Sequence, residues 1–127
     1  MIWEGPSIEF VKEPRTNPEE EIHQDRISPS VWITRAISGG QIYNILLEES
    51  ATKETSPLGT QWAEGEISEI SNLTFSPFRT AVGSPKSVVG KKLILHLEEE
   101  DVYLPVEFTS WQDNGGGGFS YIRSTRN

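Results

Sequence analysis

The chain of 127 residues contains no cysteine and only two histidines. Without cysteine it has neither disulfides nor thiolate metal sites, and cysteine content does not indicate whether the protein resides in an oxidising or a reducing compartment. His23 and His96 lack the spacing of metal ligands, so no zinc or copper site is expected. A serine hydrolase is also disfavoured, because no G-x-S-x-G motif accompanies these two possible bases.

Basic residues are scarce as well, with 11 against 19 acidic residues and a formal net charge of −8. Binding to nucleic acid or to anionic membranes requires a basic surface, so neither is expected as a partner. No apolar run approaches the roughly 18 residues of a membrane span, and no membrane insertion is expected. The start, MIWEGPSIEF, lacks a basic segment followed by an apolar one, so we expect no signal peptide in it.

The clearest strand pattern lies in Lys91–Ser124, which predicts three antiparallel strands in sequence order. Side chains alternate faces along a strand, so Leu93, Leu95 and Leu97 share one face of the first strand, and Val102, Leu104, Val106 and Phe108 share one face of the second. A tight reversal at Glu98–Asp101 then pairs Leu97 with Val102, Leu95 with Leu104 and Leu93 with Val106. The same register places His96 beside Tyr103 and Lys92 beside Glu107. Pro105 has no N–H, which predicts that one side of its strand is locally unpaired.

The rest of the chain predicts further short strands. We expect an opening strand at Ser7–Lys12, a hairpin of Val31–Arg35 with Gln41–Leu47, and short strands at Gln61–Gly65 and Leu73–Phe75. Two stretches are rich in loops, Glu13–Ser30 and Ser76–Gly90, with single helical turns expected at Asn17–Glu21 and Phe78–Val82. About seven to nine short strands predict one all-β domain over residues 1–127. The expected architecture is a β-sandwich of jelly-roll type, with a partly open β-barrel as the alternative.

Two oxygen-rich turns raise the question of a calcium site. Glu98, Glu99, Glu100 and Asp101 form one turn, and Asp113 with Asn114 precedes four glycines in the other. Carboxylates are ligands that calcium prefers, so Glu98, Glu100, Asp101 and Asp113 are candidate calcium ligands, although their spacing is not that of an EF-hand. The interpretation we favour is a solvated acidic turn, because runs of charge usually stay in water. No other cofactor is expected.

The aromatic residues are the main candidates for ligand binding. Indole and phenol rings offer apolar area with a polar rim, and such rings stack on sugars. By simple alternation Tyr103 and Trp111 lie on the outer face of their strand unless a bulge intervenes, and Tyr121 on the next strand lies closer to Trp111. These three rings, together with His96 and Glu107, are the candidate ligand-binding residues, whereas Trp32 and Trp62 are expected in the core.

Several segments together resemble a family of uncharacterised domains from secreted bacterial proteins, many of them marine. The matching segments are Trp3–Pro6, Gln24–Ile27, Val31–Arg35, Ile42–Asn44, Ser56–Ala63, Leu73–Phe75, Leu95–Leu97, Phe108–Trp111 and Gly117–Tyr121. The resemblance spans nearly the whole chain and implies an extracellular or cell-surface module of a larger protein, with no established activity. The chain departs from the pattern at Pro105, where the resemblance implies a polar residue.

Three functions follow as hypotheses. The preferred one is a non-catalytic binding or adhesion module of a secreted or cell-surface protein, with a glycan or a protein as ligand. The second is a purely structural module. The third, which we favour least, is a small glycan-acting hydrolase in which Glu107 works with Glu64 or Glu9, because Lys92 already offers Glu107 a plausible partner.

Overall fold

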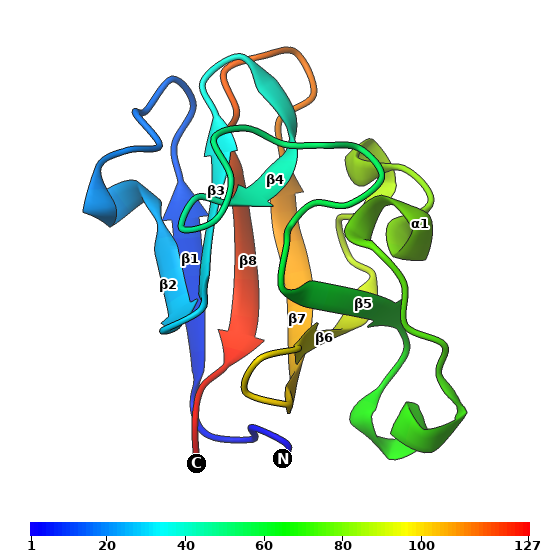
Figure 1. Cartoon of the computed structure of the whole chain (residues 1–127). Coiled ribbons are helices and arrows are strands. Elements are labelled where there is room, and N and C mark those ends of the chain that lie inside the picture. The colour runs from blue at the N-terminus through cyan, green and yellow to red at the C-terminus, as the bar shows by residue number, and fades with distance from the viewer.

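The computed structural model describes the whole chain, residues 1–127, as two antiparallel sheets packed face to face (Figure 1). The larger sheet has the order β1-β8-β7-β6-β5 and consists of β1 (Ser7–Lys12), β8 (Phe119–Ser124), β7 (Val102–Trp111), β6 (Lys92–Leu97) and β5 (Thr60–Glu64). The smaller sheet has the order β2-β3-β4 and consists of β2 (Asp25–Ser28), β3 (Val31–Ala36) and β4 (Gly39–Asn44). The expected all-β sandwich is confirmed, and no closed barrel forms.

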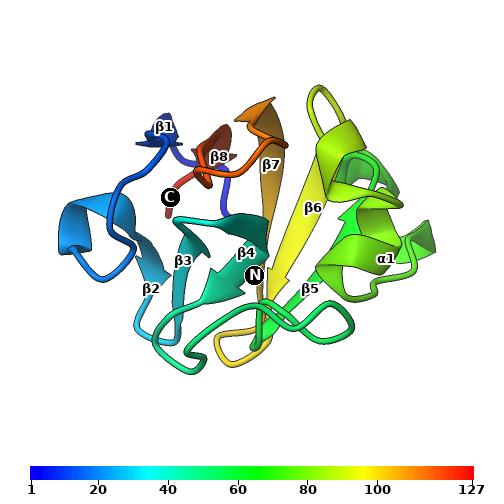
Figure 2. The same cartoon turned by 90° about the horizontal axis from the view of Figure 1, so that it is seen from above.

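Strands within each sheet follow one another in sequence, apart from β1, which pairs with β8. A jelly roll instead interleaves its strands in two Greek keys, so the likeness to it is limited to the two-layer arrangement. Helical segments are short: α1 (Phe78–Val82), and the 3₁₀ segments η1 (Glu21–His23), η2 (Ile67–Asn72) and η3 (Pro85–Ser87). In Figure 2 the small sheet lies below β1 and β8, while α1 lies beside β5. None of the helices has the length and apolar character needed to cross a membrane.

The core between the sheets follows the predicted alternation. All of the predicted inward residues of β6 and β7 are buried, namely Leu93, Leu95, Leu97, Val102, Leu104, Val106 and Phe108. Residues from the small sheet, among them Val31, Ile33 and Ile42, complete a cluster of 18 buried side chains. The helical turn predicted at Phe78–Val82 is α1, and it adds Phe78 and Val82 to this cluster.

The register predicted for the β6–β7 hairpin is confirmed at every position, including His96 opposite Tyr103 and Lys92 opposite Glu107. Pro105 lies in the middle of β7, yet the ladder to β8 ends at Val106. The next backbone groups of β7 on that side belong to Tyr103, which bonds to Met1 and Trp3 of the N-terminal segment. Pro105 therefore lies where the neighbour of β7 changes from β8 to the N-terminal segment, so that no ladder hydrogen bond is lost through its missing N–H.

Five sequence predictions are wrong in detail. The helical turn expected at Asn17–Glu21 does not form, since η1 begins only at Glu21. Trp32, expected in the core, is half-buried, with the guanidinium carbon of Arg26 3.8 Å from its ring centroid. Asp25–Ser28, expected to be loop, is strand β2, which has only one aliphatic residue to signal it. Leu73–Phe75 is not a strand, because η2 precedes it and only Ser76 bridges to Trp62. The second strand of the β3–β4 hairpin ends at Asn44 rather than Leu47, because the side-chain oxygen of Asn44 accepts the N–H of Leu46 and turns the chain outward.

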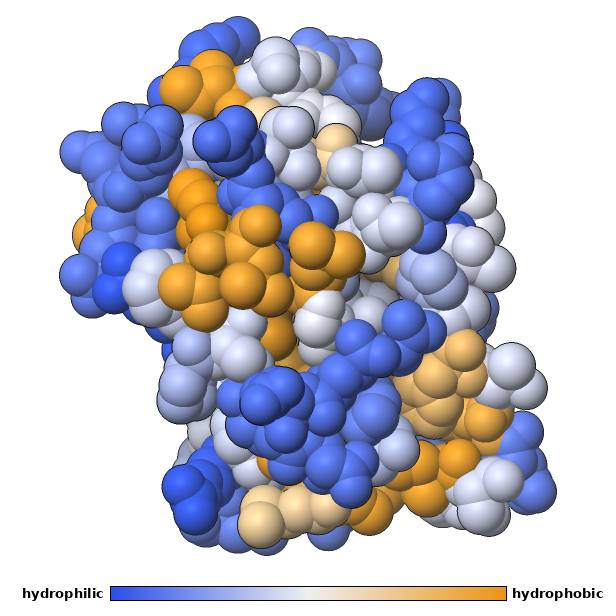
Figure 3. Space-filling view, in the orientation of Figure 1, coloured by the Kyte–Doolittle hydropathy of each residue, from blue (hydrophilic) through white to orange (hydrophobic).

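The loop that follows β4 exposes apolar side chains. Leu46, Leu47 and Leu58 are 38%, 58% and 39% exposed. Figure 3 shows the resulting apolar area over this loop, on the face of the molecule that carries the small sheet. The loop is nevertheless tied to the fold, because the Glu48 carboxylate accepts hydrogen bonds from the backbone N–H of Asn44 and Leu58 and from the Ser56 hydroxyl.

Candidate functional site

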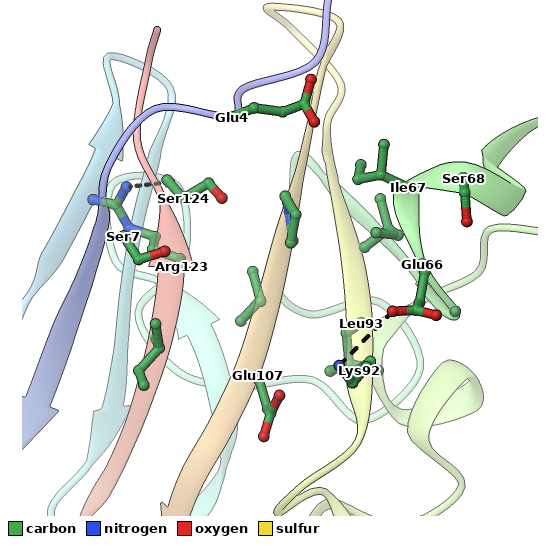
Figure 4. A pocket seen from close by; sticks show the side chains of 15 residues that line it. Glu4, Ser7, Glu66, Ile67, Ser68, Lys92, Leu93, Glu107, Arg123 and Ser124 are labelled. Atoms are coloured by element: carbon green, nitrogen blue, oxygen red, sulfur yellow. Dashed lines mark hydrogen bonds and ion pairs between the residues drawn. The ribbon is translucent and has the colours of Figure 1, made fainter.

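A hollow of about 420 Å³ opens on the outer face of the five-stranded sheet. Strands β8, β7 and β6 form its floor, and the N-terminal segment and η2 form its sides (Figure 4). We call it the outer-face hollow, and its lining includes Glu4, Glu66, Lys92, Pro105, Glu107 and Ile122.

Alternation along the strands positions these side chains. The register places Glu107 of β7 between Lys92 of β6 and Ile122 of β8, so all three project from the outer face. A capping box between Glu66 and Glu69 starts η2 and holds Glu66 at the rim. The Lys92 Nζ lies 3.7 Å from a Glu66 carboxylate oxygen, so the ion pair of Lys92 is with Glu66 and not with Glu107, its predicted partner.

The outer-face hollow combines an apolar floor with hydrogen-bond acceptors at its rim. Pro105, Ile122 and Ile67 provide the apolar surface, and the Ile94 side chain is buried beneath it. Glu4, Glu66 and Glu107 are exposed and carry acceptor oxygens. Such a surface suits a ligand with an apolar face and many hydroxyl donors.

His96 and Tyr103, two of the predicted ligand residues, lie farther along the same face. Their rings stack with centroids 4.1 Å apart and planes 7° from parallel, and Phe75 meets both rings edge-on. The His96 Nε2 also lies 3.0 Å from Asp101 Oδ1. These rings are engaged with one another and with Phe75, so they pack against the sheet instead of standing free for a ligand.

The predicted calcium ligands are dispersed. Glu98 is exposed, Glu100 accepts hydrogen bonds from the Ser30 hydroxyl at 2.7 and 2.8 Å, and Asp101 contacts His96. Asp113 lies at the opposite end of β7, beyond Trp111. No three histidine or acidic side chains come together as they would around a metal ion.

Tyr121 is buried, which corrects its placement near the protein surface. Only 1% of the residue is exposed, and its hydroxyl donates a 2.6 Å hydrogen bond to Asp25 Oδ2. Burial and the charge of Asp25 raise the pKa of Tyr121 well above its usual value.

Asp25 also accepts two hydrogen bonds from Arg123, from Nε to Oδ2 at 2.7 Å and from Nη2 to Oδ1 at 2.9 Å. Burial acts to lower the pKa of Arg123, but the hydrogen bonds and charge of Asp25 outweigh it and raise that pKa. Because Asp25 belongs to β2 and Arg123 to β8, this pair joins the two sheets.

Trp111 lies on the inner side of β7, not on the outer face as simple alternation predicts. A β-bulge at Thr109 sets both Thr109 and Ser110 against Ser120, with hydroxyl oxygens 2.6 Å apart in each pair. The extra residue reverses the alternation beyond it. Trp111 therefore packs near Phe78, Phe108 and Phe119, with the guanidinium carbon of Arg35 3.9 Å from its ring centroid.

A second hollow, of about 300 Å³, lies at this end of the sandwich, lined by residues of β3, β4, the β4–β5 loop, α1, η3 and the end of β7. We call it the loop-end hollow, and its lining includes Arg35, Lys53, Arg79, Lys86, Trp111 and Asp113. Lys53, Arg79 and Lys86 are exposed, and none of the four cations is within salt-bridge distance of a carboxylate. The hollow thus holds four cations and one carboxylate, in a chain with a net charge of −8.

Arg35 is the buried member of this group. Its Nε donates to the Gly40 carbonyl at 2.6 Å and its Nη1 to the Gly118 carbonyl at 2.8 Å. Burial lowers the pKa of Arg35 to about 10, and the Asp113 carboxylate acts in the opposite direction.

Arg35, Asp25 and Arg123 were not among the predicted site residues. Asp25 and Arg35 lie within segments that carry the resemblance, but nothing in the local sequence of Asp25 marks a buried charge. A signal was present for Arg35: it alternates with Val31 and Ile33 on the inward face of its strand. A cation at an inward strand position is unusual enough to be flagged.

A scan against protein-family models, a search of curated proteins and a search of solved structures each found no match to this chain.

Proposed function

We propose that the chain is a non-catalytic, carbohydrate-binding module that takes its ligand in the outer-face hollow. The observation that supports this most is the pairing of an apolar surface, made by Ile67, Pro105 and Ile122, with the exposed carboxylates of Glu4, Glu66 and Glu107. A sugar ring presents an apolar C–H face and hydroxyl donors in the same complementary arrangement. The candidate ligand residue Glu107 lies at the centre of this surface.

The geometry favours binding over hydrolysis. A glycosidase needs a carboxylic acid kept protonated by an apolar surrounding, next to a second carboxylate. Here the carboxylates are exposed, and the Glu66 side chain, 62% exposed, is paired with Lys92. Glu9 and Glu64, the other predicted partners of Glu107, do not line the hollow.

The proposed setting is a secreted or cell-surface protein, and the resemblance to secreted bacterial domains supports it. The absence of cysteine is compatible with a bacterial exported protein. The ligand would then be an extracellular polysaccharide.

The experiment is a glycan array followed by calorimetric titration of the best neutral oligosaccharide. The Glu107→Gln variant should bind at least about tenfold more weakly, because a hydrogen bond to a charged acceptor contributes about 1.5–3 kcal/mol. The matched control is Glu99→Gln, which changes an exposed carboxylate of the acidic turn outside the hollow and should leave the affinity unchanged. If no glycan binds saturably, a purely structural module explains the chain better.

A further inference from the structure

The loop-end hollow contains an uncompensated buried cation. Arg35 is 3% exposed and its only hydrogen-bond partners are the carbonyl groups of Gly40 and Gly118. Arginine is rarely buried in proteins unless an acidic group pairs with it. No carboxylate lies within salt-bridge distance of Arg35, and the charge of Asp113 acts on it only from farther away.

Arg123 provides the comparison within the same molecule. It is buried to a similar degree, at 7% exposed, and Asp25 meets it with two hydrogen bonds. Asp25 raises the pKa of Arg123, whereas burial lowers the pKa of Arg35 to about 10. The fold thus pairs one buried guanidinium with a carboxylate and leaves the other without an ion-pair partner.

Further positive charge surrounds Arg35. Lys12, 1% exposed, donates its Nζ only to the Thr16 carbonyl at 3.0 Å, and burial and the charge of Arg35 lower its pKa. Lys53, Arg79 and Lys86 reach the same hollow as Arg35 from the β4–β5 loop, α1 and η3. Side chains from separate elements of the fold therefore place cations around one space, and Asp113 is the only carboxylate among them.

Arg35 also keeps a donor free. Its Nη2 makes no hydrogen bond, and Arg35 is among the residues that line the hollow. The Trp111 ring and the carbonyl groups of Gly40 and Gly118 hold the guanidinium in one orientation. A fixed guanidinium with a free N–H is the group proteins use to bind carboxylate, sulfate and phosphate.

We infer that the loop-end hollow is a second binding site, separate from the outer-face hollow, for an oxyanion group of a ligand: a carboxylate, sulfate or phosphate. Arg35 binds the oxyanion through its free donor, while Arg79, Lys86 and Lys53 add positive charge at the rim. The two hollows have opposite charge, so the second site takes a ligand that the carboxylates of the first would repel.

The test is an NMR titration of the ¹⁵N-labelled chain with sodium sulfate, phosphate or glucuronate, at constant ionic strength maintained with chloride. The Nε–H signal of Arg35 and the backbone signal of Gly118 should shift and saturate with at least one of these anions. The one that binds most tightly identifies the group. Saturable binding supports the site whichever anion wins, and linear, non-saturating shifts with all three overturn it.

Surface variants keep the test independent of folding, since replacing Arg35 itself risks unfolding the chain. The double variant Arg79→Gln/Lys86→Gln changes only exposed residues and should weaken anion binding about fivefold or more. Lys92→Gln removes an exposed cation in the outer-face hollow and should leave anion binding unchanged. Equal affinity of the double variant and the original chain, or an equal loss in the Lys92 variant, would contradict the assignment. Glycan binding at Glu107 is measured separately, so either proposal can fail alone.

Discussion

The Asp25–Arg123 pair makes a quantitative prediction about stability. Replacing Asp25 by Asn keeps the shape of the side chain but leaves a buried guanidinium, 7% exposed, without its counter-charge. Breaking a buried ion pair by removing one partner typically costs about 3–5 kcal/mol. A domain of this kind is stable by only about 5–15 kcal/mol, so this is a large share of the total.

The expected change in melting temperature follows from the size of the chain. At about 2.1 cal/mol/K per residue, 127 residues give an unfolding entropy of about 0.27 kcal/mol/K. A loss of about 3–5 kcal/mol therefore lowers the Tm by about 11–19 °C. Differential scanning calorimetry measures the Tm, and urea unfolding followed by tryptophan fluorescence measures the free energy directly.

A double-mutant cycle separates the pair from its surroundings. With Arg123→Met added to Asp25→Asn, no buried charge is left unpaired, and the double variant should lose less stability than the two single losses combined. Lys92→Gln serves as the surface control: its ion pair with Glu66 spans 3.7 Å between side chains 66% and 62% exposed, and its loss should cost under about 1 kcal/mol. A loss below about 1 kcal/mol for Asp25→Asn would refute the argument.

Other predictions concern the pH dependence, the glycine loop and metal ions. Unfolded tyrosine loses its proton near pH 10, whereas buried Tyr121 keeps it. The free energy of unfolding should therefore fall by up to about 1.4 kcal/mol per pH unit above pH 10, and less steeply in the Tyr121→Phe variant. Parallel slopes of the two proteins in alkaline urea titrations would contradict this. Gly117→Ala should cost at least about 2 kcal/mol of stability, because φ is 71° and the added Cβ would lie 1.9 Å from the Ala36 carbonyl oxygen. Gly90→Ala, with φ 85° and open space around the added Cβ, should cost about 1–2 kcal/mol from backbone strain alone. Equal losses of the two variants in urea unfolding would be evidence against the clash. Addition of calcium or of EDTA should leave the Tm unchanged, because no cluster of acidic side chains forms in the fold. A higher Tm with calcium would instead support the predicted calcium ligands.

The sequence predicted the fold best where one register satisfied both faces of a strand. The leucines of β6 and the aliphatic residues of β7 alternate without interruption, so the hairpin register could be deduced pair by pair. Strand β2 could not, because it is held by the contact of Asp25 with Arg123, 98 residues later, and not by an apolar pattern.

The candidate sites were harder to predict, because they depend on one irregularity and on long-range partners. Alternation placed Glu107 correctly on the outer face, but the bulge at Thr109 reversed the pattern before Trp111. Alternation alone cannot reveal a bulge, because the sequence Phe108–Trp111 is compatible with Trp111 on the inner or on the outer face of the sheet. Tyr121 was misplaced for the same reason, because it was predicted as a ligand residue through its closeness to Trp111.

The glycine loop between β7 and β8 has a consequence for how any ligand would bind at the loop end. Although its composition is typical of a flexible linker, the Gly116 carbonyl accepts the Arg15 N–H at 2.7 Å, and Gln112 and Gly118 exchange hydrogen bonds. Gly117 lies so close to Ala36 that no side chain would fit. The entropy of ordering this loop is lost when the chain folds, and little remains to be lost on binding. Trp111 and Asp113, which precede the glycines and line the loop-end hollow, are therefore held by an ordered connection. Selectivity there would then come from a rigid shape, and a ligand of a different shape would be rejected.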